Sequence, residues 1–258
     1  MPQPNPRSLP DFADVPIERD RWALFADVDG TLLSFAARPA DVAPVPGLLE
    51  ALRRAARALD GALALVSGRP VDDLDAILGD LPVAMAGGHG HERRRADGSR
   101  TEGPAVPEGL SAMRDAFDRF QAAHPGTLVE HKTFGVALHY RQAPELAAAA
   151  VAMAEDALKS VGGEIALLRG NMVVEAKGAT TDKGAAVRAF MAEAPFEGRT
   201  PVFVGDDVTD EDGFAAVNEM RGYSVLVGDR SPTAARYRLA DVPAVHRWLE
   251  TVGREAAA

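Results

Sequence analysis

Short apolar runs that end in acidic residues or glycine alternate with helix-like segments near the start of the chain. Ala23–Asp27 is an apolar run followed by Gly30, and this pattern predicts a buried strand. From Pro46, leucine and alanine recur on one face of a predicted helix, which ends at Gly61. Ala62–Val66 predicts a second buried strand. A strand, a helix and a strand in this order are typical of a parallel sheet.

The same alternation returns in the last third of the chain. Lys183–Ala194 has helical periodicity, and Val202–Val204 and Val225–Val227 are short apolar runs that predict strands. Because these elements continue the strand–helix grammar of the first region, the fold class expected is α/β, with a Rossmann-like parallel-sheet core.

The segment between these two regions has a different pattern. A helix predicted near Leu110–Ala123 precedes two strand-like runs, Thr127–Glu130 and Val136–Tyr140. A helix near Pro144–Val161 precedes two more strand-like runs. This repeated alternation predicts a small α+β unit inserted into the core. We therefore expect an extended lead-in of residues 1–20, a catalytic core of residues 21–97 and 178–258, and an inserted α+β cap domain of residues 98–177 that sets substrate specificity.

Composition narrows the classes of function. The chain is 47% hydrophobic and 26% charged, as is usual for a soluble globular protein. Its net charge of −10 argues against nucleic acid or anionic membranes as partners, and the absence of cysteine excludes disulfides and zinc–thiolate sites. No apolar stretch approaches the roughly 20 residues of a bilayer span. With no secretory signal at the N-terminus, we expect a cytoplasmic protein, and a monomer is compatible with the sequence.

The first predicted strand ends in a pair of carboxylates, Asp27 and Asp29. Residues i and i+2 of an extended chain share a face, and open α/β sheets bind ligands at the carboxyl ends of their strands. One carboxylate can attack phosphorus while its neighbour handles the leaving-group proton. Gly30 permits a tight turn, and Thr31 can offer a hydroxyl to phosphate. An ordinary strand-to-turn junction is the alternative, because Asp and Gly favour turns.

Two further residues are candidates for binding phosphate. Ser67 ends the second predicted strand, where a hydroxyl and free backbone N–H groups can hold phosphoryl oxygens. Lys183 opens a helix, a position that usually favours an acid, and this suggests a placed cation. A simple turn at Ser67 and a solvated surface side chain at Lys183 are the alternatives.

A cluster of acids follows the strand at Val202–Val204. Asp206, Asp207, Asp210 and Glu211 occupy four of six positions, and oxygen-only clusters of this kind suit Mg²⁺. A calcium loop is the competing interpretation. It fails because its first ligand position is Val208.

Together these stretches resemble the haloacid dehalogenase-like phosphatase superfamily. The resemblance implies that Asp27 is the nucleophile and that Asp29 is the general acid that later activates water. It also implies that Ser67 and Lys183 hold the phosphoryl group.

The same resemblance implies a Mg²⁺ site. Its ligands would be Asp27, Asp206 and the main-chain carbonyl of Asp29. Asp207 and Asp210 would lie at the metal or just behind it.

Three stretches resemble a narrower family. Thr127–Arg141, Ala86–Arg94 and Ala194–Glu211 match signatures of the trehalose-6-phosphate phosphatases, and the likeness runs from about Leu24 to Leu249. The second distinctive stretch of the inserted segment, Asn171–Gly184, departs from that family, because Gly178 and Ala179 follow Lys177 where proline is usual. A looser turn there would alter cap closure or affinity.

This family resemblance implies a sugar site of Glu130, Lys132 and Glu175. Carboxylates and ammonium groups suit a ligand rich in hydroxyls, whereas two solvated positions on one strand face are the alternative for Glu130 and Lys132. The other substrate-binding residues expected are Gly30, Thr31, Arg69, His89 and Arg141. Arg141 could instead pair with an acid of the cap, and His89 with His91 could bind a metal from one strand face.

The function expected is Mg²⁺-dependent hydrolysis of trehalose 6-phosphate to trehalose and phosphate through a phospho-aspartate intermediate, the last step of trehalose biosynthesis. A phosphatase for another sugar phosphate, such as sucrose phosphate, is one alternative. A non-catalytic module that senses a sugar phosphate and a phosphoryl transferase acting between sugars are the others.

Overall fold

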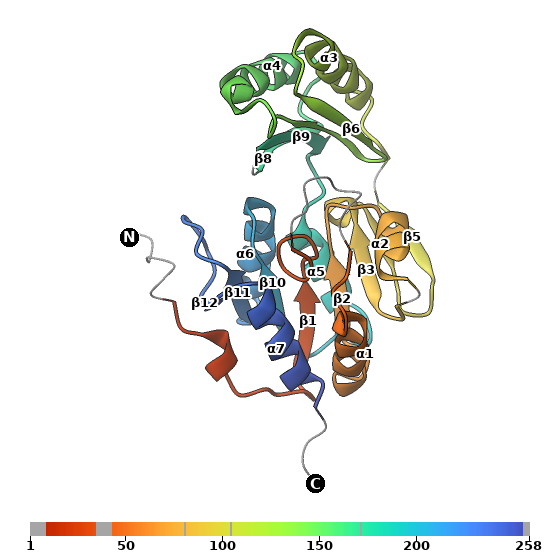
Figure 1. Ribbon diagram of the computed structural model, residues 1–258. Coiled ribbons are helices and arrows are strands. Elements are labelled where there is room, and N and C mark those ends of the chain that lie inside the picture. The colour runs from red at the N-terminus through yellow and green to blue at the C-terminus, as the bar shows by residue number, and fades with distance from the viewer. Residues whose placement is uncertain (1–8, 35–42, 80, 104, 171, 255–258) are drawn as a thin grey trace. The chain divides into compact units, whose positions relative to one another are not determined.

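The computed structural model describes residues 9–34, 43–79, 81–103, 105–170 and 172–254. The chain divides into two compact units (Figure 1). Met1–Glu102 and Asp182–Ala258 form the first, called here the core unit, and Gly103–Thr181 form the second, called the inserted unit.

Both divisions fall a few residues later than the expected boundaries at 97/98 and 177/178. The strand β5 (Arg100–Glu102) pairs with β4 (Glu92–Arg94) in the core sheet, which keeps residues up to Glu102 in the core unit. At the second division, the buried Lys177 ammonium donates to the carbonyl of Thr181, which holds this turn to the inserted unit.

The core unit is built on an eight-stranded sheet in the order β12-β11-β10-β1-β2-β3-β4-β5. Its parallel strands are β1 (Trp22–Ala26), β2 (Leu63–Val66), β3 (Ala84–Gly87), β10 (Thr200–Gly205), β11 (Tyr223–Val227) and β12 (Tyr237–Leu239). At one edge the pairing is antiparallel: β4 runs opposite to β3, and β5 runs opposite to β4. The expected α/β class with a parallel-sheet core is confirmed. Because β10, β1 and β2 are adjacent and parallel, the residues that follow them meet at one edge.

Alternate side chains of β1 explain how helices cover both faces of this sheet. Trp22 packs near Trp248 of α7 (Val242–Val252), and α7 lies beside α1 (Leu48–Ala58) (Figure 1). Phe25 points the other way and packs against Phe190 of α5 (Lys183–Met191), which pairs with α6 (Glu211–Glu219). A strand that is buried on both faces is expected to be apolar throughout, and all five residues of β1 are buried.

The second half of the proline-rich segment belongs to this core. Residues 1–20 were expected to be an extended lead-in, but Phe12–Asp14 form a 3-10 helix, and Phe12 is fully buried. The Phe12 ring lies 5.4 Å from the rings of Trp248 and Tyr237 and 5.7 Å from that of Trp22. Aromatic burial on this scale offsets the entropy of ordering the segment.

The inserted unit is a four-stranded antiparallel sheet covered on one face by two helices. Its strand order is β6-β7-β9-β8, and the strands are β6 (Leu128–Lys132), β7 (Gly135–His139), β8 (Ile165–Gly170) and β9 (Val173–Gly178). The helices are α3 (Leu110–Ala123) and α4 (Ala147–Lys159), the latter preceded by a 3-10 turn at Pro144–Leu146. Val136, Leu138 and Val174 face the helices, so the alternate residues of the same strands form the opposite face.

Several elements were not predicted from the sequence. These are α2 (Val71–Leu78), α6, α7 and the strands β3, β4, β5 and β12. Four of them have only three or four residues, too few for a periodicity to show, and helix α2 has eight.

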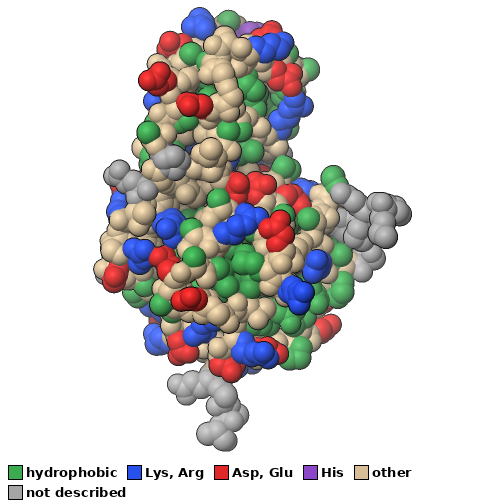
Figure 2. All heavy atoms as spheres, turned by 180° about the vertical axis from the view of Figure 1, so that it is seen from behind, with side chains coloured by type: hydrophobic (Ala, Val, Ile, Leu, Met, Phe, Trp, Pro, Cys, Tyr) green, Lys and Arg blue, Asp and Glu red, His purple; other side chains and the backbone are tan. Residues whose placement is uncertain are grey.

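Surface charges of both signs are interspersed on the face shown in Figure 2. Ion pairs such as Arg188–Glu219 bring opposite charges together on exposed helix positions. None of the helices in the described ranges combines the length and the apolar character that a bilayer span requires.

Replacing Phe12 with alanine should destabilise the protein, because the core would lose a buried ring contacted by four other rings. The free energy of unfolding is expected to fall by about 3–5 kcal/mol, measured by urea denaturation. Val45→Ala, at an exposed position, is the control and should change it by less than about 0.5 kcal/mol. Equal denaturation midpoints for Phe12→Ala and the wild type would contradict this account of the segment.

Candidate phosphate and metal site

The loop after β1 lies against the loop after β10. The N–H of Asp27 donates to Val204 (2.9 Å), and Gly30 closes the turn by donating to the carbonyl of Leu33 (2.7 Å). Gly30 has a φ of +86°, and a Cβ at this position would lie 2.3 Å from a carboxylate oxygen of Asp206. The Thr31 hydroxyl donates to Asp206 Oδ1 at 3.1 Å. Glycine is therefore required here both for the turn and for the close approach of Asp206.

Lys183 is a buried cation rather than a solvated surface lysine. Its side chain is 3% exposed, and its Nζ lies 2.6 Å from Asp27 Oδ1 and 2.6 Å from Asp210 Oδ1. The N-cap residue Asp182 accepts a hydrogen bond from Ala185 N–H and so fixes the start of α5, from which Lys183 projects. Two carboxylates from separate loops thus converge on one ammonium group.

Asp210 orders the segment 206–211, called here the acidic loop, of which it is itself a part. It is fully buried, and its Oδ2 accepts the backbone N–H groups of Asp206 and Asp207, both at 2.9 Å. A Cβ on Gly205 would lie 2.3 Å from the Asp210 side chain, so the close packing needs glycine there. The side chain of Asp207 instead takes part in a capping box with Asp210.

The site carries more negative than positive charge. Asp27, Asp206 and Asp210 offer carboxylate oxygens that all lie within 4.8 Å of one another, around the single ammonium of Lys183. Burial and then the charge of Asp210 raise the pKa of Asp27 well above its ordinary value. The same two causes raise the pKa of Asp206 to about 7. Burial alone would lower the pKa of Lys183, but Asp210 and Asp27 outweigh it and raise that pKa.

This excess of carboxylate charge fits a divalent cation. The oxygen-only donor set is the one that hard cations prefer, and a cation would offset both the burial and the repulsion that raise the two pKa values. Among the described residues, this trio is the one group of three acidic or histidine side chains close enough to share an ion.

Asp29 stands apart from the carboxylate trio and is held by Arg69. The guanidinium contacts the carboxylate twice, with Nε at 2.6 Å from Oδ2 and Nη2 at 2.8 Å from Oδ1. The N–H of Arg69 also donates to the hydroxyl of the buried Ser67 (3.1 Å). The loop after β2 therefore brings Ser67 and Arg69 to the same edge as the loop after β1.

The two histidines near this edge do not share a strand face, as their spacing had suggested. His89 lies in a 3-10 turn with a φ of +56°, and His91 follows that turn. A Cβ on Gly68 would lie 2.7 Å from the His89 ring, so the imidazole packs directly on the loop that carries Ser67. No histidine belongs to the described group that could hold a metal.

The predicted sugar residues share one face of the inserted sheet, opposite α3 and α4. Strand register places Glu130 and Glu175 on either side of Ala137. Lys132 Nζ lies 2.7 Å from Glu175 Oε2, with 17% of the Lys132 side chain exposed, so Lys132 is not a freely solvated position.

His139 was missed in the sequence, and its Nε2 lies 2.9 Å from Glu130 Oε2. The hydrogen bond from His139, helped by the charge of Lys132, lowers the pKa of Glu130 against the opposing effect of burial. The sequence signal that could have identified His139 is the alternation of faces along β7, which places it on the same face as Ala137. Arg141 is exposed and forms no ion pair with another described residue, so pairing with an acid of the unit gains no support.

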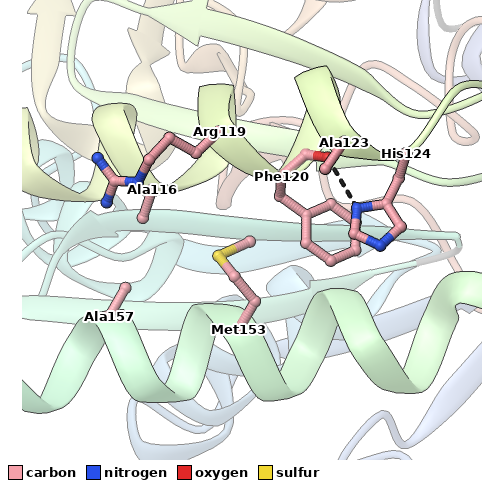
Figure 3. A pocket seen from close by; sticks show the side chains of 7 residues that line it. All are labelled: Ala116, Arg119, Phe120, Ala123, His124, Met153 and Ala157. Carbon is pink, nitrogen blue, oxygen red and sulfur yellow. Dashed lines mark hydrogen bonds between the residues drawn. The ribbon is translucent and has the colours of Figure 1, made fainter.

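A hollow of about 360 Å³ lies on the helical side of the inserted unit (Figure 3). Figure 3 shows Met153 of α4 projecting towards α3, with Arg119 at one end and the stacked Phe120 and His124 rings at the other. The sheet separates this hollow from the polar face that carries Glu130, so the hollow is not part of the predicted sugar site.

The raised pKa of Asp206 predicts a pH effect on the metal-free protein. Between pH 4 and pH 7 the folded state holds a proton on Asp206 that the unfolded chain, with a pKa near 3.8, has released. The free energy of unfolding of the wild type therefore falls as pH rises through this range. With chelator present, the stability of Asp206→Asn relative to wild type should rise by about 2 kcal/mol from pH 5 to pH 8, measured by denaturation. Asp73→Asn, at an exposed position, should show no such trend, and parallel pH profiles for Asp206→Asn and wild type would contradict the assignment.

Comparison with a solved structure agrees with the architecture. The C-terminal domain of the trehalose-6-phosphate phosphatase of C. albicans superposes with a TM-score of 0.82, covering 95% of this chain and 98% of that one at 21% sequence identity. At this identity the likeness establishes the fold alone.

Sequence comparison reaches further. The chain is 43% identical to the trehalose-6-phosphate phosphatase of Escherichia coli (strain K12), over 90% of this chain and 86% of that protein. It is 40% identical to a probable trehalose-phosphate phosphatase of Sinorhizobium fredii, over 87% and 83% of the two chains. The family model described as trehalose-phosphatase matches residues 25–243. With that match spanning both units, and with these relatives aligned over most of its length, the protein belongs to the trehalose-phosphatase family.

Proposed function

We propose that the protein hydrolyses trehalose 6-phosphate to trehalose and inorganic phosphate, the last step of trehalose biosynthesis. The observation that carries the proposal is the buried Lys183 ammonium between Asp27 and Asp210, beside Asp206, at the carboxyl edge of the core sheet. Membership of the trehalose-phosphatase family supports the choice of substrate.

In the first chemical step, Asp27 is the nucleophile. Lys183 holds Oδ1 of Asp27 in place, so the other carboxylate oxygen attacks phosphorus. The bond between phosphorus and the sugar oxygen breaks as the new bond to Asp27 forms, and Asp29 delivers a proton to the departing oxygen. The products are free trehalose and an aspartyl phosphate.

In the second step, water attacks phosphorus and breaks its bond to Asp27, while Asp29 accepts the proton of the water. Arg69 holds Asp29 through two hydrogen bonds in this structure, and a guanidinium binds phosphate with the same forked geometry. Binding of the substrate phosphate to Arg69 would therefore free Asp29 for proton transfer. Ser67 and Thr31 supply hydroxyls to the phosphoryl oxygens.

The carboxylate trio supports Mg²⁺ as the cofactor. Asp27 and Asp206 would hold it, together with the main-chain carbonyl of Asp29. Asp210 would lie behind them, because its two oxygens already bind Lys183 and two backbone N–H groups. When bound, Mg²⁺ would neutralise phosphoryl oxygens as negative charge shifts in the transition state.

The polar face of the inserted sheet supports recognition of the sugar. Glu130 and Glu175 lie on either side of Ala137, so the strand register sets two hydrogen-bonding groups on one face, one strand apart. Lys132 and His139 fix the two carboxylates, so each presents its remaining lone pairs in a defined direction. Preorganised groups of this kind favour a ligand that offers many hydroxyls.

Asp27→Asn should abolish turnover, because an amide cannot form the aspartyl phosphate. Phosphate release from trehalose 6-phosphate is expected to fall by at least about 1,000-fold in Mg²⁺, with the fold unchanged by circular dichroism. Wild-type activity should be lost in excess chelator and should be far weaker on glucose 6-phosphate and sucrose 6-phosphate. Even turnover across the three sugars would discard the trehalose assignment, and tight binding without turnover would favour a sensing module.

Glu130→Gln should separate sugar recognition from chemistry. With trehalose 6-phosphate, KM is expected to rise by about 10-fold or more, because a charged hydrogen-bond acceptor is lost. With p-nitrophenyl phosphate, which lacks the sugar, kcat/KM should stay within about twofold of wild type. His139→Gln should follow the same pattern more weakly, since it acts through Glu130; equal losses on both substrates would refute a role in recognition.

A further inference from the structure

The loop that carries Asp206 is held on two sides. On the amide side, Asp210 accepts the N–H groups of Asp206 and Asp207. On the carbonyl side, Arg230 donates from Nε to the carbonyl of Asp206 (3.2 Å) and from Nη2 to the carbonyl of Asp207 (3.3 Å). The peptide group between Asp206 and Asp207 is thus held at both its carbonyl and its N–H, so it cannot rotate without breaking a hydrogen bond. The peptide groups before and after it are each held by one hydrogen bond.

Arg230 is itself held firmly. Its Nη2 also donates to Glu211 Oε1, and its Nη1 donates to the carbonyl of Pro232 (2.6 Å). The second oxygen of Glu211 accepts the N–H of Ala234 (2.7 Å). The guanidinium and the carboxylate are mostly buried, at 23% and 26% side-chain exposure, so this pair is less screened than a surface ion pair. The loop after β11 is therefore tied to the acidic loop after β10.

We propose that Arg230 is a positioning residue for Asp206 and sets the affinity of the protein for Mg²⁺. Arg230 bonds the main chain of Asp206 and not its carboxylate, so it acts through the backbone. Glu211 neutralises its charge, which leaves orientation as its contribution. Residues behind a metal ligand commonly change metal affinity by about 10- to 100-fold when they are replaced. The proposal rests on the proposed metal-binding role of Asp206.

The test is calorimetric titration of Mg²⁺ into metal-free protein without substrate. For Arg230→Ala, the dissociation constant is expected to rise by about 10-fold or more. In phosphate release from trehalose 6-phosphate, the half-saturating Mg²⁺ concentration should rise by a similar factor. The kcat at saturating Mg²⁺ should stay within about threefold of wild type, because Arg230 touches no reacting group.

Two further variants separate positioning from charge and from general stability. Arg230→Lys keeps the positive charge but lacks the planar guanidinium that reaches both carbonyls. Its Mg²⁺ affinity should therefore be close to that of Arg230→Ala. It also serves as the deciding variant if Arg230→Ala does not fold. Arg188→Ala removes another arginine–glutamate pair of the core unit, at an exposed position, and should bind Mg²⁺ as wild type does.

The outcomes distinguish this proposal from the proposed function. A folded Arg230→Ala or Arg230→Lys with a dissociation constant within about twofold of wild type overturns the role of Arg230, and so does full rescue by lysine. A wild-type protein that binds Mg²⁺ but hydrolyses no sugar phosphate overturns the proposed function and leaves the Arg230 comparison intact. A wild-type protein that binds no Mg²⁺ overturns both.

Discussion

The buried contact of Lys183 with Asp27 and Asp210 is the interaction on which the rest of the core unit depends. Charged groups removed from water are strongly destabilising unless they are paired and hydrogen-bonded. Here the ammonium lies 2.6 Å from each carboxylate, and the remaining oxygen of Asp210 is satisfied by two backbone N–H groups. The pairing is incomplete in charge, because one ammonium faces two carboxylates and Asp206 adds a third. That excess of negative charge suits a divalent cation, which would offset the carboxylates and also the charge of a bound phosphate.

The architecture explains how such a group can be assembled. Strand β1 lies between β10 and β2 and is buried on both faces, so its end is fixed by packing on every side. Helix α5 packs on one of these faces through Phe190 and Phe25, and this places Lys183 at the same edge. Glycine at positions 30 and 205 lets side chains approach where any Cβ would collide. The same edge is ordered from its loops by Asp210 and Arg230, residues that hold backbone rather than ligand.

The two faces of the sheet in the inserted unit differ in chemical character. One face packs apolar side chains of β7 and β9 against α3 and α4, which gives the unit its own core. The other face is free of that packing and carries two pairs, Lys132–Glu175 and Glu130–His139. Because strand residues alternate between faces, the same short segments supply the apolar core on one face and the proposed sugar-binding groups on the other. This is why a family signature can lie within a strand that also builds the core.

The sequence by itself determined the α/β class, the inserted α+β unit and the candidate residues Asp27, Ser67, Lys183 and Asp206. These follow from local signals, since apolar runs that end in acids or glycine mark strand ends wherever they occur. Tertiary structure decided the rest, because contacts between distant segments leave no periodic trace. In the sequence Phe12 is part of a proline-rich lead-in, whereas in the fold four rings from other elements enclose it. Arg230 reads as a loop residue until the fold brings it to the carbonyls of Asp206 and Asp207, because a hydrogen bond to backbone depends on position and not on the identity of its partner.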